Sequence, residues 1–319
     1  MDNNKKYCNK LKAAKYYYNE NLTQQEIADR LYLSRPTVSK MLKEAKEEGI
    51  VQFKIVDIKN KCHMFELEEK LMNKFNLKNV IVAEYDDNYD NLKDKIGKAA
   101  ASYFEDAVKS KMKIGISWGT TLKAMVQNLD FNSNVKGLEI VSMVGGSRNL
   151  LTDIQANILV ENILNKYSGT GYFLYAPAVV DNEAISENLK NNQETKEILQ
   201  KAREVDIAFV GIGPEIEKST LKNTGYFTEE EIEKLKEHHS VGDVCWRFFD
   251  KNGNAAIEEM DKRTIGINLE ALKEMETVVG VAGGKEKIDA ILASLKGGFL
   301  DVLITDENTA RKVLDKGSE

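Results

Sequence analysis

Residues 23–42 read TQQEIADRLYLSRPTVSKML. Thr23 is expected to cap a first short helix, because Glu26 three positions later completes a capping box. Ser34 is expected to cap a second helix, and Pro36 lies in its first turn, where its missing N–H costs nothing. Two short helices joined by a tight turn form a helix-turn-helix. The small Ala28 at the expected crossing and the basic second helix favour this motif over a capped helix pair of a bundle.

The second helix of this motif predicts a DNA-reading surface. Its N-terminal side chains and the positive end of its dipole would face the DNA. Arg35 and Lys40 can reach guanine edges or phosphates, and the start of the first helix is a common point of phosphate contact. The expected DNA-binding residues are Thr23, Gln24, Ser34, Arg35, Thr37, Ser39, Lys40 and Lys43.

The charge of the chain is unevenly distributed. The net charge of the 319 residues is −6, yet residues 1–60 carry a net +4 and the remainder a net −10. A small basic N-terminal segment on an otherwise acidic chain suits phosphate binding by that segment alone, although a net charge of +4 is modest. No apolar run approaches the ~20 residues of a membrane span, and the polar N-terminus has no signal core. Three cysteines, far apart, predict neither disulfides nor a zinc site. We therefore expect a cytoplasmic protein that binds no metal and does not contact a membrane.

The rest of the chain predicts two further parts. Residues 50–58 resemble a strand, and residues 61–76 an amphipathic helix that serves as a connector or an oligomer contact. Beyond them, apolar runs alternate with helical segments, which predicts a doubly wound, mostly parallel α/β sheet. The expected domains are a helix-turn-helix domain at 1–58, a connector helix at 59–78 and an effector domain at 79–319. The expected strands are 79–84, 112–117, 138–144, 172–175, 205–211, 278–282 and 300–304.

Four of these strands end in glycines, in MKIGISWGTT (112–121), LEIVSMVGG (138–146), VDIAFVGIG (205–213) and VVGVAGGKEK (278–287). In open α/β sheets, ligands bind at the carboxyl ends of the strands. Gly119, Thr120 and Thr121 would offer backbone N–H groups and two hydroxyls to an anion, although a tight strand-to-helix turn explains them equally. No lysine follows as in a nucleotide-binding P-loop.

Charged residues near these strands complete the candidate site. Lys285 and Lys287 stand at the start of a helix, where a cation opposes the dipole, so a bound anion or simple surface exposure would explain them. Asp181 and Asp243 are candidate acceptors for sugar hydroxyls, although Asp181 would equally cap a helix at 183–190.

Ordered motifs over almost the whole chain resemble the SorC/DeoR-type family of sugar-sensing transcription regulators, and most closely its deoxyribonucleoside-type members in Gram-positive bacteria. The resemblance implies an effector domain similar in fold to sugar-phosphate isomerases and glucosamine-phosphate deaminases, which binds a phosphorylated sugar. By position, Gly119, Thr120, Thr121 and Lys287 would hold the phosphate. Gly145, Gly146, Asp181 and Asp243 would line the sugar. The motifs are QQEIA, LSRPTVSK, GISWGTT, EIVSMVGG, APAVVDN, GYFTEEE, VGDVCWRFFD, KRTIGI and VAGGKEKIDAILASLKGGFLDVLITDENTA.

Two departures from the family pattern bear on the ligand. Members that sense deoxyribose phosphate have a lysine just before the Gly-Gly, able to form a Schiff base, where this chain has Val144. The arginine that grips a second phosphate in glycolytic members is missing near Thr224. The resemblance therefore implies reversible binding of a sugar monophosphate.

The sequence thus predicts a regulator, most simply a repressor of a sugar or nucleoside catabolic operon, that needs no cofactor. Operator DNA, the effector and further copies of the chain, as a dimer or tetramer, are its expected partners, since such readers act in pairs. The alternatives are a sugar-phosphate isomerase or deaminase with a DNA-binding head, and a DNA-binding protein with a vestigial pocket. An enzyme would need a general base, and Asp181 or Asp243 lacks a convincing carboxylate–histidine constellation.

Overall fold

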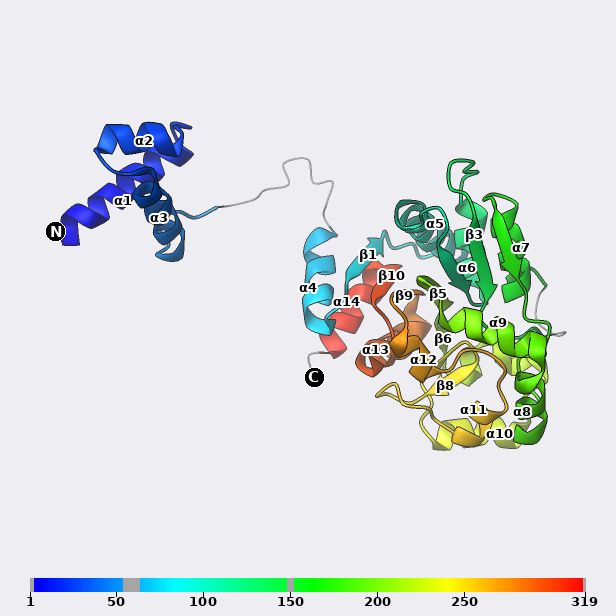
Figure 1. The fold of residues 1–319 in the computed structure, drawn as a ribbon. Coiled ribbons are helices and arrows are strands. Elements are labelled where there is room, and N and C mark those ends of the chain that lie inside the picture. The colour runs from blue at the N-terminus through cyan, green and yellow to red at the C-terminus, as the bar shows by residue number, and fades with distance from the viewer. Residues whose placement is uncertain (1–2, 54–63, 148–151, 318–319) are drawn as a thin grey trace. The chain divides into compact units, whose positions relative to one another are not determined.

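The chain divides into two units, Met1–His63 and Met64–Glu319 (Figure 1). The computed structural model describes residues 3–53, 64–147 and 152–317. The predicted boundary at residue 58, most of the strand predicted over 50–58 and the start of the predicted connector lie outside the described residues. The described part of that predicted strand, 50–53, is not a strand.

The first unit contains the predicted helix-turn-helix. Its helices are α1 (Asn3–Tyr18), α2 (Gln24–Leu31) and α3 (Arg35–Glu47). The Thr23 hydroxyl accepts a hydrogen bond from the backbone N–H of Glu26, and the Glu26 carboxylate accepts one from that of Thr23. Ser34 caps α3 in the same way through the N–H of Thr37. The predicted caps and the order of the helices are confirmed.

Small residues let the three helices pack closely. The side chain of Lys10, in α1, is buried as well, and its ammonium pairs with the carboxylates of Glu44, at 3.2 Å, and of Glu48. Helix α1 contacts α3 through alanines, which bring the two backbones close together, and its larger side chains Leu11 and Tyr17 remain 49% and 36% exposed. The core consists of Ala13, Ala14, Ile27, Ala28, Val38, Leu42 and Ala45.

The second unit is built on a seven-stranded sheet in the order β1-β10-β9-β5-β2-β3-β4. Every neighbouring pair in it is parallel. The prediction of a parallel α/β sheet is confirmed, although the strand expected at 172–175 ends at Tyr172. The strands are β1 (Asn79–Ala83), β2 (Lys113–Ile116), β3 (Leu138–Ser142), β4 (Gly169–Tyr172), β5 (Ile207–Gly211), β9 (Val278–Val281) and β10 (Val302–Asp306).

Helices cover both faces of this sheet, as the alternation of side chains requires (Figure 1). Phe209 of β5 packs in one core with α5, α6 and α7, whereas the next residue, Val210, packs in the other with α4, α9, α12, α13 and α14. These helices are α4 (Phe65–Phe75), α5 (Tyr89–Ala107), α6 (Thr120–Asn128), α7 (Ala156–Leu164), α9 (Gln193–Arg203), α12 (Leu269–Glu274), α13 (Ile288–Gly297) and α14 (Glu307–Lys316).

Helix α4, which was predicted to be a connector or an oligomer contact, belongs to the second unit and packs in its core. Leu67 and Leu71 are buried in the core of that unit. Lys74 donates a hydrogen bond to the carbonyl of Leu314 in α14 at 2.7 Å. The carboxylate of Glu68 accepts the backbone N–H of Val82 at 2.9 Å, which occupies a donor of the edge strand β1. The apolar face of α4 is therefore used within its own chain.

A small antiparallel sheet, absent from the sequence prediction, lies beyond the main sheet. Its central hairpin turns through Cys245 (φ 53°) and Trp246 (φ 65°), two buried side chains in the left-handed region. Such turns usually contain Asn-Gly, so this hairpin had no sequence signal. The strands are β6 (Gly213–Pro214), β7 (Gly242–Val244) and β8 (Arg247–Phe249). The second unit also contains the helices α8 (Glu183–Asn191), α10 (Glu229–Glu237) and α11 (Glu258–Lys262).

Candidate functional site

A pocket of about 490 Å³ lies at the carboxyl ends of the central strands. Trp118 and Gly119 follow β2, Gly211 is the last residue of β5, and Gly283 follows β9. The chain crosses from β4 back to β5 on the other side of β2, so β2 and β5 flank the switch point of the sheet. This is where open α/β sheets bind ligands, and the volume suits a small molecule.

The start of α6 forms one wall of this pocket. Gly119 has φ 135° and provides no side-chain cap. A β-carbon there would meet no atom within 4 Å, so the space in front of the helix is open. Thr120 and Thr121 are the first two helical residues, and both line the pocket. The first N–H groups of a helix have no partner within it, so this end can bind an anion.

Asp243 and Lys287 add two ionisable groups. Asp243 of β7 is 1% exposed, and its Oδ1 has no hydrogen-bond partner among the described residues. Burial raises its pKa to about 7, against the lowering effects of Lys287 and of the N–H of Trp246. Burial also lowers the pKa of Lys287 to about 8, while Asp243 opposes that change. Each group lacks full solvation, so a polar ligand would satisfy both.

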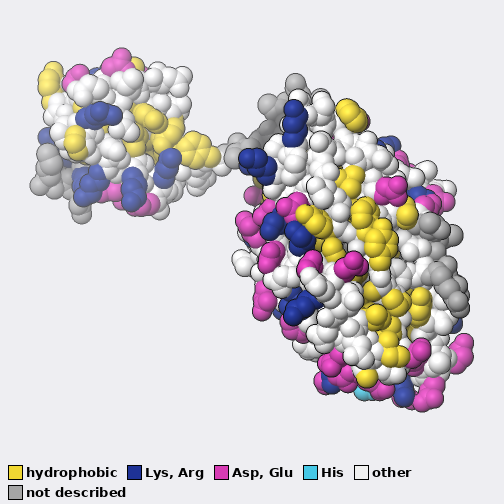
Figure 2. Space-filling model, turned by 45° about the vertical axis from the view of Figure 1, so that its right-hand side comes forward, with side chains coloured by type: hydrophobic (Ala, Val, Ile, Leu, Met, Phe, Trp, Pro, Cys, Tyr) yellow, Lys and Arg dark blue, Asp and Glu magenta, His cyan; other side chains and the backbone are white. Residues whose placement is uncertain are grey.

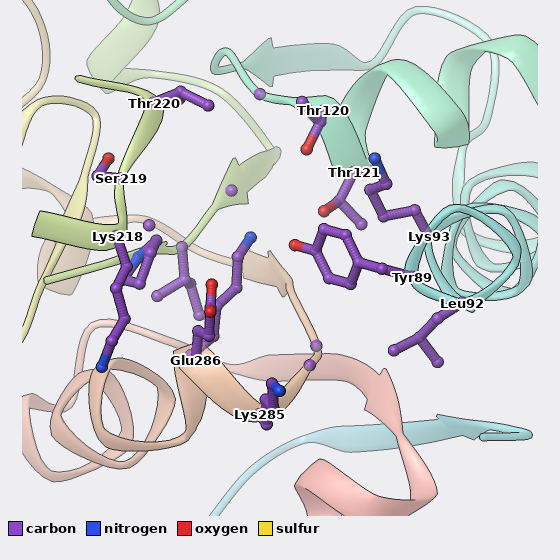
Figure 3. A pocket seen from close by; sticks show the side chains of 18 of the residues that line it. Tyr89, Leu92, Lys93, Thr120, Thr121, Lys218, Ser219, Thr220, Lys285 and Glu286 are labelled. Carbon is purple, nitrogen blue, oxygen red and sulfur yellow. The ribbon is translucent and has the colours of Figure 1, made fainter. Parts of the chain in front are cut away.

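The remaining walls come from three further segments of the chain (Figure 3). Tyr89 and Lys93 of α5 lie on the same side as Thr121, whereas Lys218, Ser219 and Thr220 lie across the pocket. Lys285 is exposed at the start of the short helix η4 (Lys285–Lys287). The loop before α5 contains no glycine that would have marked it as part of the pocket. Its place between a predicted strand and helix of a parallel sheet was the signal that would have located it.

Three predicted effector residues do not line this pocket. Gly145 is required by a close backbone crossing, since a β-carbon there would lie 2.5 Å from the carbonyl oxygen of Ala176. Gly146 belongs to the same crossing, through its bridge to Pro177. Asp181 is exposed, and the N-cap of α8 is its neighbour Asn182. The other predicted effector residues line the pocket, namely Gly119, Thr120, Thr121, Asp243, Lys285 and Lys287.

The polar residues of α3 form a second candidate surface. Lys40 and Lys43 are 76% and 79% exposed, and they lie at the long distances of 3.9 Å from Glu44 and 3.8 Å from Glu47. Arg35 and Ser39 are exposed, and Thr37 is half-buried. Thr23 and Ser34 already serve as caps, and Gln24 is half-buried at the start of α2. Figure 2 shows Lys and Arg side chains spread over the visible face of this unit.

Comparison with known proteins decides the family. A model of the family described as "Putative sugar-binding domain" matches residues 59–315, and a winged helix-turn-helix DNA-binding model matches residues 17–52. The chain belongs to the SorC/DeoR-type family of sugar-binding transcriptional regulators. It is similar to the deoxyribonucleoside regulator of Bacillus subtilis, with 32% identity over 99% of both chains. It is also similar to the sorbitol operon regulator of Klebsiella pneumoniae, with 30% identity over 95% of this chain and 96% of that one.

Solved structures agree with this assignment. The full-length sorbitol operon regulator SorC of Klebsiella pneumoniae matches with a TM-score of 0.75 and 29% identity, over 96% of this chain and 98% of that one. A transcriptional regulator from Streptococcus pneumoniae matches with a TM-score of 0.76 and 30% identity, over 81% and 98% of the two chains. These relatives are regulators, and this chain is likewise a DNA-binding transcription regulator and not an enzyme.

Within the described residues, no group of three or more His, Cys, Asp or Glu side chains is arranged to hold a metal ion. No helix among the same residues is long and apolar enough to span a membrane.

Proposed function

We propose that this regulator is a repressor of a sugar or nucleoside catabolic operon, acting in the cytoplasm, whose operator affinity is controlled by a phosphorylated sugar. The observation that carries the proposal is the pocket at the switch point of the sheet. It combines a helix start without a side-chain cap, a buried carboxyl whose Oδ1 has no partner among the described residues, and an amine whose pKa is lowered by burial.

The phosphate would bind at the start of α6. The free N–H groups after Gly119 and the hydroxyls of Thr120 and Thr121 supply donors, and the helix dipole favours an anion. Lys287, which lines the same pocket, would supply a positive charge. Burial lowers the pKa of Lys287 and so disfavours its ammonium form, and a bound phosphate would reverse that effect.

The sugar would bind beside Asp243. The Oδ1 of Asp243 lacks a partner among the described residues and is an acceptor for a hydroxyl. Lys218, the cation across the pocket, already pairs with Glu215 at 2.6 Å. A single phosphate at α6 therefore suits the charges better than two. Val144 is buried and cannot form an imine, so we expect no covalent adduct at its position after borohydride treatment.

Control of transcription would follow from linkage. A ligand that binds differently to arrangements with different DNA affinity shifts the population between them, and the coupling is reciprocal. The helix-turn-helix would act in pairs on a pseudo-palindromic operator, so the functional form would be a dimer or a tetramer. The proposed DNA contacts are the polar residues of α3 with the starts of the two motif helices.

A thermal-shift screen of pentose and hexose monophosphates tests this function. A ligand that binds only the folded state raises the melting temperature by mass action. The hit is then added to the operator complex in a gel-shift titration. Stabilisation by one sugar phosphate, together with release of DNA, supports the proposal. Stabilisation without any change in operator affinity would refute the regulatory role of the pocket.

A further inference from the structure

Tyr89 lies on the wall of the pocket, and sequence reasoning gave it no role. It is the first residue of α5, and its phenol points into the pocket on the side of Thr121 (Figure 3). Asn88 caps this helix, accepting the backbone N–H groups of Asp90 at 2.9 Å and Asn91 at 3.1 Å. The direction in which Tyr89 leaves the backbone is thus set by a well-capped helix start.

Two neighbours hold the ring of Tyr89. A β-carbon at Gly284 would lie 3.0 Å from its Cε2 atom, so the ring lies close against the glycine turn that leads to Lys287. Gly284 also has φ 102°, a conformation that favours glycine. The ammonium of Lys93 lies 4.9 Å from the ring centroid and pairs with Asp90 at 2.7 Å. With Lys93 over the ring, the hydroxyl is the part of Tyr89 best placed to meet a ligand.

The hydroxyl of Tyr89 is an available donor. Tyr89 is 49% exposed, and the partial burial of its ring raises the pKa of the phenol, as do the charges of Glu286, Asp90 and Asp306, so the phenol keeps its proton at neutral pH. Within the described ranges no residue hydrogen-bonds this hydroxyl. A neutral phenol at the mouth of an anion site donates its proton to an acceptor and does not repel it.

We propose that Tyr89 binds the effector directly, its hydroxyl donating a hydrogen bond to the phosphate alongside Thr121 and the start of α6. This inference rests on the proposed function, because it requires the phosphate to lie at α6. Tyr89 adds a third element, α5, to the site. The phosphate would then be bound by residues at the start of α6, in the turn between β9 and α13, and at the start of α5.

The test uses Tyr89→Phe in the full-length chain, with Tyr103→Phe as the matched control. Tyr103 is also on α5, but its ring packs against Phe209 and does not line this pocket. Calorimetry measures binding of the tightest sugar monophosphate from the screen, and inorganic phosphate is titrated as its competitor. A hydrogen bond to a charged group predicts that Tyr89→Phe weakens both ligands about tenfold. Tyr103→Phe should weaken neither.

The outcomes separate this inference from the proposed function. Failure of every sugar phosphate to bind the wild-type chain refutes the proposed function, whatever Tyr89 does. Wild-type binding with equal affinity in Tyr89→Phe overturns the inference alone. If Tyr89→Phe weakens sugar-phosphate binding but inorganic phosphate competes as well as before, the hydroxyl contacts the sugar, and the inference is overturned. The inference is also overturned if inorganic phosphate does not compete for the wild-type chain. Equal melting temperatures of the unliganded variants exclude a folding defect.

Discussion

A β-carbon at Gly213 would lie 1.9 Å from Oδ1 of Asp243, so the missing side chain of Gly213 is what leaves room for the Asp243 carboxyl. Gly213 begins β6, two residues after the end of the central strand β5, and it pairs with Asp243 of β7 in the small antiparallel sheet. The two sheets therefore meet at the pocket, and the glycine after β5 has a defined physical role there.

Replacing Gly213 with Ala should displace the Asp243 carboxyl from its position in the pocket. Loss of one hydrogen bond to the ligand would weaken sugar-phosphate binding by about 1–3 kcal/mol. Gly213 does not have a positive φ, so alanine adds no backbone strain. Calorimetry checks the loss, and Asp243→Asn is the comparison. Full affinity in Gly213→Ala would mean that the position of Asp243 does not matter to the ligand.

Stability should depend on pH through Asp243. Burial raises its pKa to about 7 in the folded chain, against a reference value of 3.8. A carboxyl raised in this way stabilises the fold fully below its unfolded pKa, and the contribution is lost as pH rises through about 7. Asp243→Asn cannot ionise. Its melting temperature minus that of the wild type should therefore be more positive at about pH 8 than at about pH 5. A difference independent of pH would contradict the raised pKa.

The polar face of α3 predicts the effects on DNA binding. Arg35→Ala or Lys40→Ala should weaken operator binding by about 1–3 kcal/mol if the side chain reads a base, and should lower the salt slope if it holds a phosphate. Arg30→Ala is the charge-matched control, because Arg30 faces α1, where it pairs with Glu20 and lies over Tyr16. Fluorescence anisotropy at several salt concentrations measures both quantities. Unchanged affinity in the two α3 variants would exclude α3 as the reader.

Because α4 packs in the core of the second unit, a charge on its buried face should destabilise the fold and not only change the oligomeric state. Leu67 is 6% exposed in the core of the second unit. Leu67→Glu would bury an unpaired charge and should cost about 3–5 kcal/mol of stability. Glu69→Gln, at an exposed position of the same helix, is the control. Denaturant unfolding followed by circular dichroism measures the cost. An unchanged unfolding midpoint for Leu67→Glu would show that α4 does not need this apolar contact.

Sequence patterns predicted the elements with strong local signals. The Thr23 and Ser34 caps located α2 and α3, and the buried apolar runs located the parallel strands. Each of these signals is contained within a few consecutive residues, so it can be read without the tertiary structure. The hairpin at Cys245 escaped prediction because its turn is stabilised by distant packing, such as that of Trp246 on Trp118, rather than by turn residues.

The pocket was predicted in part. The glycines that follow three of the strands line the pocket, whereas the glycines at 145–146 allow a close backbone crossing. A glycine pattern alone cannot distinguish these two roles. Tyr89 carried no signal because its position depends on how the loop after β1 reaches the pocket. Only the folded chain brings it beside Thr121 (Figure 3).

The proposed regulation depends on a phosphate that binds at the start of α6. Titration calorimetry compares a sugar monophosphate with its unphosphorylated sugar, on the wild type and on Thr121→Val. The phosphorylated form should bind at least about tenfold tighter, and Thr121→Val should lose about 1–3 kcal/mol of that affinity, while unliganded operator affinity is unchanged. Equal binding of the unphosphorylated sugar, or full affinity in both Thr121→Val and Lys287→Ala, would contradict it.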